Sequence, residues 1–140
     1  MHLLDINVWL ALTFQRHPHH APANAWFSAA PKDSCCFCRF TQLGFLRLAT
    51  TPQVMATDVL TMKAAWLAFD KLYNDPHVVF VDEPPGIQPL WRSFTVQKTF
   101  SPKVWNDAYL AAFAMIVDYE FVTFDKGFAQ YAGLRHAILT

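Results

Sequence analysis

The chain has 140 residues and a mass of 16.0 kDa, and its 11 lysines and arginines balance 11 aspartates and glutamates. This length matches a single domain, residues 1–140, which can bury enough surface to fold without a disulfide or a structural metal. A formal charge of zero excludes the broad basic surface of a protein that coats duplex nucleic acid. Because 54% of the residues are hydrophobic and 16% are aromatic, we expect part of the apolar surface to face a partner, and we predict a homodimer.

Short apolar runs alternate with longer segments of helical period along the chain. In chain order, the pattern predicts a strand at residues 2–5, helices at 7–14 and 21–30, a strand at 34–38, helices at 40–49 and 58–74, a strand at 77–82, helices at 87–94 and 101–117, a strand at 120–125, a short helical turn at 127–134 and a strand at 137–139. Asp58 is the expected cap of the 58–74 helix, and Ser101 with Pro102 is the expected start of the 101–117 helix.

Strands separated by helices pair in parallel, because the chain must cross over before the next strand begins. We therefore predict an α/β fold, a three-layer α/β/α sandwich with a central parallel sheet of 4 to 5 strands. In open parallel sheets, ligands bind at the carboxyl ends of the strands. The residues that follow each strand are consequently the first candidates for a functional site.

Three features bear on where the protein works. The longest apolar stretch, residues 108–117, is shorter than the roughly 20 residues needed to span a bilayer, so we predict no membrane segment. The first ten residues, MHLLDINVWL, lack the basic start of a signal peptide. Cys35, Cys36 and Cys38 are an odd number and stand too close together to link distant parts of a fold. We therefore predict a cytoplasmic protein with reduced thiols.

Three aspartates converge on the predicted carboxyl edge of the sheet. Asp5 in LLDINVW and Asp125 in FVTFDKGF follow strands, and Asp107 lies near the start of a helix, where backbone N–H groups are unpaired. Carboxylates brought together repel each other, and a divalent cation converts that repulsion into binding. Mg²⁺ and Mn²⁺ prefer oxygen ligands, and such an ion can hold a phosphodiester oxygen and acidify a bound water. We predict that these three aspartates are metal ligands.

A structural interpretation of the same acids stays open. Asp5 could cap a helix that starts at Ile6, and Asp125 could hold the turn at Gly127. Asp107 has no comparable structural role in the pattern. The remaining acids are typical of caps, turns and exposed helix positions.

Four strings, LLDINVWLAL, RFTQLGFLRLAT, WNDAYLAAFA and FVTFDKGF, occur in this order across residues 3–138. Together they resemble the PIN-domain ribonucleases of bacterial toxin–antitoxin systems, the VapC-like toxins. The resemblance implies a parallel-sheet α/β/α sandwich and an active site in which four acids hold Mg²⁺ or Mn²⁺ to cut single-stranded RNA. By motif, Asp5 matches the first acid of that site, Asp107 the third and Asp125 the fourth.

The second position of the family site departs from the pattern. Family members commonly place a glutamate in the helix after the second strand, whereas this chain has Thr41 and Gln42 there. Gln42 keeps an oxygen that can accept a bond from a metal-bound water, but it carries no charge. We include Gln42 among the catalytic residues and expect weaker metal binding than a glutamate gives.

Five further residues are candidates for contact with the substrate. Lys126, Lys103 and Arg39 adjoin the acidic motifs and are candidate contacts to RNA phosphates, although each could equally be ordinary solvated surface. Asn7 could bond the scissile phosphate or orient the first acid, and Thr123 could orient the turn that carries the fourth.

The resemblance implies a metal-dependent endoribonuclease, the toxin of a toxin–antitoxin pair, with RNA as substrate, a cognate antitoxin as partner and Mg²⁺ or Mn²⁺ as cofactor. A second interpretation is a catalytically attenuated PIN module that binds RNA or a protein partner, which the glutamine at position 42 favours. A phosphotransfer α/β domain also places an aspartate after its first strand, but D-I-N-V-W lacks the second aspartate of the dehalogenase pattern.

Overall fold

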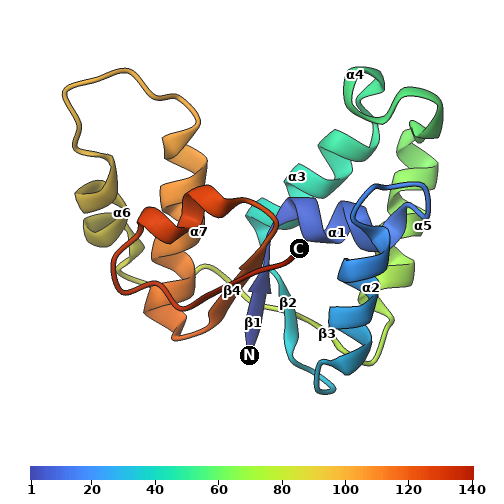
Figure 1. Cartoon of the computed structure of the whole chain (residues 1–140), viewed down its shortest axis with the longest axis horizontal. Helices are drawn as coiled ribbons and strands as arrows, with labels where there is room; N and C mark the ends of the chain where they lie inside the picture. The colour runs from blue at the N-terminus through green and yellow to red at the C-terminus, as the bar shows by residue number, and fades with distance from the viewer.

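Five short strands form one parallel sheet in the computed structural model of residues 1–140 (Figure 1). The strands are β1 (His2–Leu4), β2 (Cys35–Phe37), β3 (Val78–Phe80), β4 (Glu120–Thr123) and β5 (His136–Ile138). Their order across the sheet is β3-β2-β1-β4-β5, and every neighbouring pair is parallel. The first strand of the chain is therefore the central one.

Helices cover both faces of the sheet. They are α1 (Ile6–Thr13), α2 (His20–Ala29), α3 (Arg39–Ala49), α4 (Pro52–Met55), α5 (Met62–Tyr73), α6 (Ile87–Thr95) and α7 (Val104–Val117), with short 3-10 helices η1 (Ala56–Asp58) and η2 (Lys126–Gln130). α6 and α7 pack on one face, and α1, α2, α3 and α5 on the other (Figure 1). The predicted α/β/α sandwich is confirmed. No helix combines the length and the apolar character that crossing a bilayer requires.

Strands β1 to β4 each supply side chains to two cores, because successive residues point to opposite faces of the sheet. Leu3 packs in the core beneath α7, and its neighbour Leu4 packs in the core beneath α1. In the second core, the ring of Trp9 stacks on that of Phe37 with centroids 3.8 Å apart. All four side chains are fully buried. The strands are thus covered on both faces, which is why their sequences are continuous apolar runs.

The long helix predicted at residues 58–74 is shorter than expected. α5 begins at Met62, where Thr61 Oγ1 accepts a hydrogen bond from Ala64 N at 3.1 Å. The expected cap, Asp58, lies in η1 instead. Threonine and aspartate cap helices by the same chemistry, so the sequence pattern could not decide between them.

The start of α7 also differs from the prediction. The helix begins at Val104, and the flanking residue Lys103 makes no capping bond with its side chain. Ser101 accepts from Val104 N at 3.0 Å through its backbone carbonyl, not its hydroxyl. Ser101 and Pro102 therefore form a turn before the helix and do not start it.

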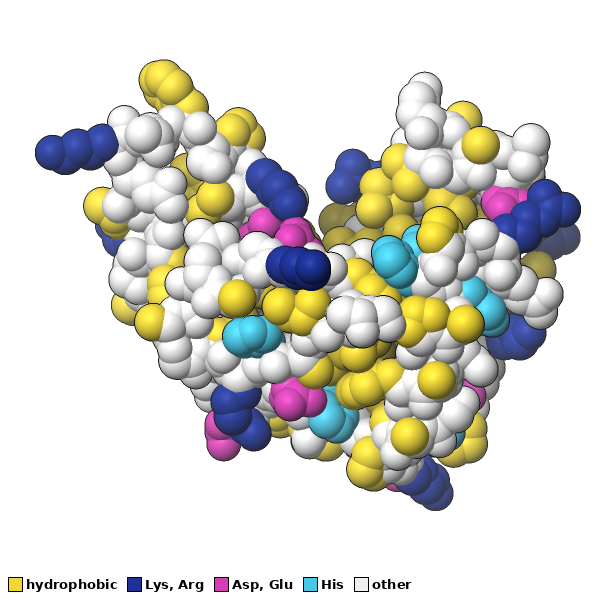
Figure 2. Space-filling model, in the orientation of Figure 1, with side chains coloured by type: hydrophobic (Ala, Val, Ile, Leu, Met, Phe, Trp, Pro, Cys, Tyr) yellow, Lys and Arg dark blue, Asp and Glu magenta, His cyan; other side chains and the backbone are white.

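The carboxyl ends of the strands face a hollow in the surface between the α6–α7 side and the α3–α5 side (Figure 2). Acidic and basic side chains lie beside each other at the floor of this hollow. Gly44 of α3 allows the close approach of α3 to α1, because a Cβ at this position would overlap Ile6 Cδ1 and lie 2.9 Å from Ile6 Cγ1. This contact packs the middle of α3 against the first residue of α1, directly after Asp5.

Candidate active site

Asp5 and Asp125 come together because their strands are neighbours. β1 and β4 pair in parallel with Leu4 opposite Val122, and Asp5 N donates to Val122 O at 2.9 Å. Asp125 follows β4 two residues after its last member. Parallel strands end at the same edge of a sheet, so both carboxylates lie at its carboxyl edge.

The hydroxyl of Thr123 joins the turns that carry these two acids. Its Oγ1 donates to Asp5 Oδ2 at 2.6 Å and accepts from Asp125 N at 2.9 Å. Asn7 completes the network: its Nδ2 donates to the same Oγ1 at 3.2 Å, and its Oδ1 accepts from Phe124 N at 3.4 Å. Thr123 is fully buried, and in this structure its hydroxyl orients the acids; its contact with substrate stays a prediction.

Asp5 is both a helix cap and a member of the acidic cluster. Its Oδ1 accepts from Ile6 N at 2.7 Å, at the N-cap of α1. Burial, with smaller contributions from the charges of Asp107 and Asp125, raises the pKa of Asp5 from 3.8 to about 6, although hydrogen bonds from Thr123 and Ile6 oppose the shift. The capping role that the sequence left open therefore coexists with membership of the cluster.

Lys103 lies between the other two acids. Its Nζ is 2.9 Å from Asp125 Oδ2 and 3.9 Å from Asp107 Oδ2. The hydrogen bond from Lys103, with a second from Gly127 N at 2.8 Å, holds the pKa of Asp125 below its ordinary value. Burial raises the pKa of Asp107, and the more distant Lys103 offsets this only in part. The lysine that the sequence predicted as a phosphate contact thus pairs with carboxylates in this structure.

Gln42 and Arg39 form a second polar pair on α3. Gln42 is buried, and its Oε1 accepts a hydrogen bond from the guanidinium of Arg39, which lies 4.9 Å from the centroid of the Phe80 ring. Arginine has only donors, so this contact fixes which end of the amide is oxygen. Lys126, the remaining candidate for RNA contact, is exposed beside Asp125.

The donor atoms of the acidic cluster are of the kind that a hard divalent cation prefers. Carboxylate oxygens dominate the cluster, and the charges of Asp5, Asp107 and Asp125 act on one another. Tyr131 adds an orphaned polar atom: its buried hydroxyl has no partner, and burial with the charges of Asp107 and Asp125 raises its pKa to about 12. As the side chains lie, no three His, Cys, Asp or Glu residues form a group that could hold a metal, and the ammonium of Lys103 supplies the positive charge. The residues fit such an ion once the ammonium of Lys103 moves away from Asp107 and Asp125.

Sequence reasoning missed the pairing of Lys103 with the acids, although one signal was present. Lys103 and Asp107 are four residues apart, the spacing at which opposite charges pair along a helix. Tyr131 gave no signal, because its approach to the cluster depends on the path of the chain through η2.

Residues 2–134 match the family model of the PIN domain, and the chain therefore belongs to the PIN-domain family. Within it, the chain is 40% identical over 144 residues to Ribonuclease VapC41 of Mycobacterium tuberculosis, with 99% of each chain covered. It is 32% identical over 132 residues to Ribonuclease VapC44 of the same organism, with 93% of this chain and 89% of the relative covered. The resemblance to VapC-like toxins that the four motifs carried is confirmed.

Solved structures share the fold at low sequence identity. DNA-bound VapBC from Salmonella typhimurium gives a TM-score of 0.70 at 14% identity, over 97% of this chain and 96% of that chain. VapC20 of Mycobacterium tuberculosis, a toxin that cleaves the sarcin–ricin loop, gives 0.68 at 16% identity, over 96% and 99%. The α/β/α arrangement that places the acids at one edge is thus the arrangement of these proteins.

The raised pKa of Asp5 predicts how stability depends on pH. Between pH 4 and 6 the folded chain binds a proton at Asp5 that the unfolded chain releases, so the free energy of unfolding of the metal-free protein falls as pH rises through this window. Asp5→Asn removes this dependence and stabilises the protein in EDTA at pH 7 by about 2 kcal/mol. Urea unfolding from pH 4 to 7 measures the effect.

Asp70→Asn is the matched control, because Asp70 is an exposed carboxylate on α5 and does not belong to the acidic cluster. It should leave the pH dependence of the free energy of unfolding unchanged. A loss of stability in Asp5→Asn at pH 7 would show that the cap and the Thr123 bond outweigh the buried charge.

Proposed function

We propose that this protein is a metal-dependent endoribonuclease, the toxin of a toxin–antitoxin pair, which hydrolyses RNA phosphodiester bonds with Mg²⁺ or Mn²⁺. The observation that carries the proposal is the meeting of Asp5, Asp107 and Asp125 at the carboxyl edge of the sheet, in a chain 40% identical to Ribonuclease VapC41. Packing alone gives no reason for three coupled carboxylates at one edge.

Asp5, Asp107 and Asp125 would hold the ion, and each is positioned by a different element. Asp5 is fixed by Thr123 and by the start of α1, so its carboxylate has little freedom. Asp125 is fixed by its own turn, and Asp107 reaches the cluster from the first turn of α7. When bound, a divalent ion polarises the phosphate and lowers the pKa of a coordinated water.

Basic side chains near the acids would hold the RNA backbone. Lys126 is exposed directly after Asp125, and the guanidinium of Arg39 is exposed beside Gln42 at the same edge of the sheet. Asn7 supports this arrangement indirectly, because both ends of its amide are bonded to residues 123–124. A few basic side chains at one place are sufficient for a protein of zero formal charge to bind the phosphates of a short stretch of RNA.

The partner we propose is a cognate antitoxin that blocks the hollow until it is removed. Several solved relatives of the same fold are VapBC complexes, some of them bound to DNA. A short reading frame beside the gene, encoding a DNA-binding protein, is the genomic observation that tests this partner.

The three buried free cysteines suit a reducing compartment, and we propose the cytoplasm.

The purified chain, freed of any partner, should cleave single-stranded RNA with Mg²⁺ or Mn²⁺ and not in EDTA. Asp5→Asn and Asp107→Asn should each lower the cleavage rate by about 100-fold or more, because each removes a charged oxygen ligand. Circular dichroism checks that both variants remain folded, and Asp70→Asn should cut at the wild-type rate. Equal cutting in EDTA, or full activity of Asp107→Asn, would refute metal-dependent cleavage at this site.

We also propose that the chain forms a homodimer through an apolar patch on α3 and α5. Leu43, Met62, Trp66 and Leu67 are 50–77% exposed there, beside a groove of about 350 Å³. Light scattering at micromolar concentration should give twice 16.0 kDa, and Trp66→Asp should shift the mass towards 16.0 kDa. Val96→Asp, an equally polar change at a residue 76% exposed elsewhere, should leave the mass unchanged. A wild-type monomer contradicts the dimer.

A second candidate function, a PIN module that binds RNA or a protein with little catalysis, is favoured by Gln42. Gln42→Glu should increase metal affinity by about tenfold or less, because a charge is added near the ion but is shared with the guanidinium of Arg39. RNA cleavage measured against Mn²⁺ concentration tests this. Coincident curves for the two proteins would remove Gln42 from the metal site. Cleavage by the glutamate variant alone would establish the natural protein as the attenuated module.

A further inference from the structure

Lys103 is the one lysine or arginine that makes a salt bridge with the acidic cluster. Its Nζ donates to Asp125 Oδ2 at 2.9 Å and lies 3.9 Å from Asp107 Oδ2. The charges of both acids and, more weakly, of Asp5 act on it and raise its pKa. A single ammonium therefore interacts with all three carboxylates.

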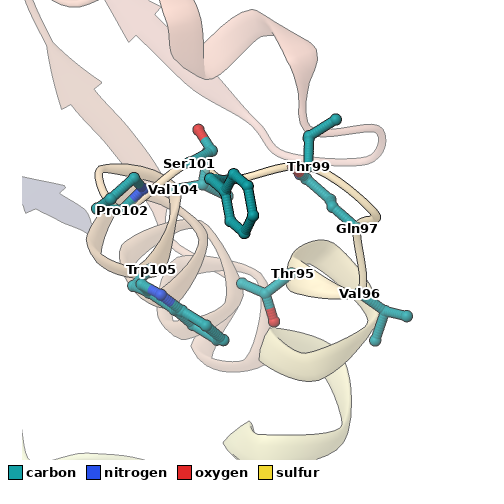
Figure 3. A pocket seen from close by; sticks show the side chains of 9 residues that line it. Thr95, Val96, Gln97, Thr99, Ser101, Pro102, Val104 and Trp105 are labelled. Carbon is teal, nitrogen blue, oxygen red and sulfur yellow. The ribbon is translucent and has the colours of Figure 1, made fainter.

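The position of Lys103 in the chain is unfavourable without these acids. It flanks the first residue of α7 and makes no capping bond with its side chain. The start of a helix carries a partial positive charge, which disfavours a cation there. Its neighbours Val104 and Trp105 line a cavity of about 330 Å³ on the α6 side of α7, shown in Figure 3, and Lys103 is not part of that wall. The carboxylates are thus what offsets the cost of a lysine at this position.

We propose that Lys103 is the resident counterion of the acidic cluster, and that a divalent cation binds by displacing its ammonium from Asp125 and Asp107. The proposal rests on the proposed metal-dependent function. In the metal-free protein Lys103 neutralises part of the repulsion among the acids, so the fold does not depend on an ion. On binding, the cation takes over this neutralisation.

The contact is well suited to being exchanged. The side chain of Lys103 is 73% exposed, and it has four rotatable bonds, so its ammonium can leave the cluster for water. Exposed ion pairs contribute little stability, whereas a divalent ion brings twice the charge to the same oxygens. A divalent ion can therefore replace the Lys103 ammonium at these oxygens.

Binding of Mn²⁺ to the full chain, monitored by electron paramagnetic resonance of the free ion at pH 7 without RNA, tests this displacement. Lys103→Met keeps an unbranched side chain only one atom shorter and removes its charge, so the dissociation constant for Mn²⁺ should fall by about fivefold. Lys103→Arg should restore a value close to wild type. Lys126→Met is the matched control: it removes the same charge beside Asp125 from a side chain that makes no ion pair, and should change the constant by less than about twofold.

Thermal unfolding in EDTA provides the second readout. Lys103→Met should melt about 2–4 °C below wild type, because the acids lose their counterion, and Mn²⁺ should abolish this difference. A dissociation constant for Lys103→Met that equals that of wild type or of Lys126→Met overturns the proposal, as does an unchanged melting temperature in EDTA. If neither wild type nor Lys103→Met binds Mn²⁺, the metal-dependent function fails together with displacement. The melting temperatures in EDTA then still decide whether Lys103 is a counterion.

Discussion

The hydrogen bond from Thr123 Oγ1 to Asp5 Oδ2 ties together two strand ends that are 118 residues apart in the sequence. It exists only because the first strand of the chain takes the central place in the sheet and pairs with β4. The same hydroxyl accepts from Asp125 N and from Asn7, so it has no capacity left for another partner. Two carboxylates of the site are therefore fixed by buried structure, and only the third comes from a helix.

Electrostatic repulsion among the carboxylates of the acidic cluster lowers the stability of the fold. Asp5, Asp107 and Asp125 carry three negative charges when ionised, and Lys103 returns one, which leaves a net charge of −2. A divalent cation that displaces Lys103 changes the charge of the cluster from −2 to −1, because it brings two positive charges where the ammonium brought one. The raised pKa of Asp5 measures the cost in the metal-free chain, since burial and its neighbours both oppose ionisation there. Clustered carboxylates of this kind lower the stability of the metal-free fold and would raise the affinity for a cation, as is common at binding sites.

Periodicity predicted the sandwich because its strands are apolar on both faces, and the position of Asp5 and Asp125 after strands predicted the edge at which they meet. The pattern failed where several residues offered equivalent chemistry. Thr61 and Asp58 are both good caps, and only tertiary packing selects one. Side-chain pairing was also beyond the sequence: the contact of Lys103 with Asp125 depends on how the turn before α7 lies relative to the turn after β4, which no local pattern encodes.

The pairing of Gln42 with Arg39 changes what the missing glutamate means. A glutamate at position 42 would neutralise the guanidinium that bonds it, so the charge of that pair would be zero. Gln42 accepts the same bond without a charge, and Arg39 keeps its full positive charge at the exposed edge. In the proposed nuclease, a glutamine at position 42 would attract a metal ion less than a glutamate, and Arg39 would attract a phosphate more. In a chain with a formal charge of zero, such a local cation would contribute to the proposed binding of RNA, and it would offset in part the weaker metal affinity that we propose for Gln42.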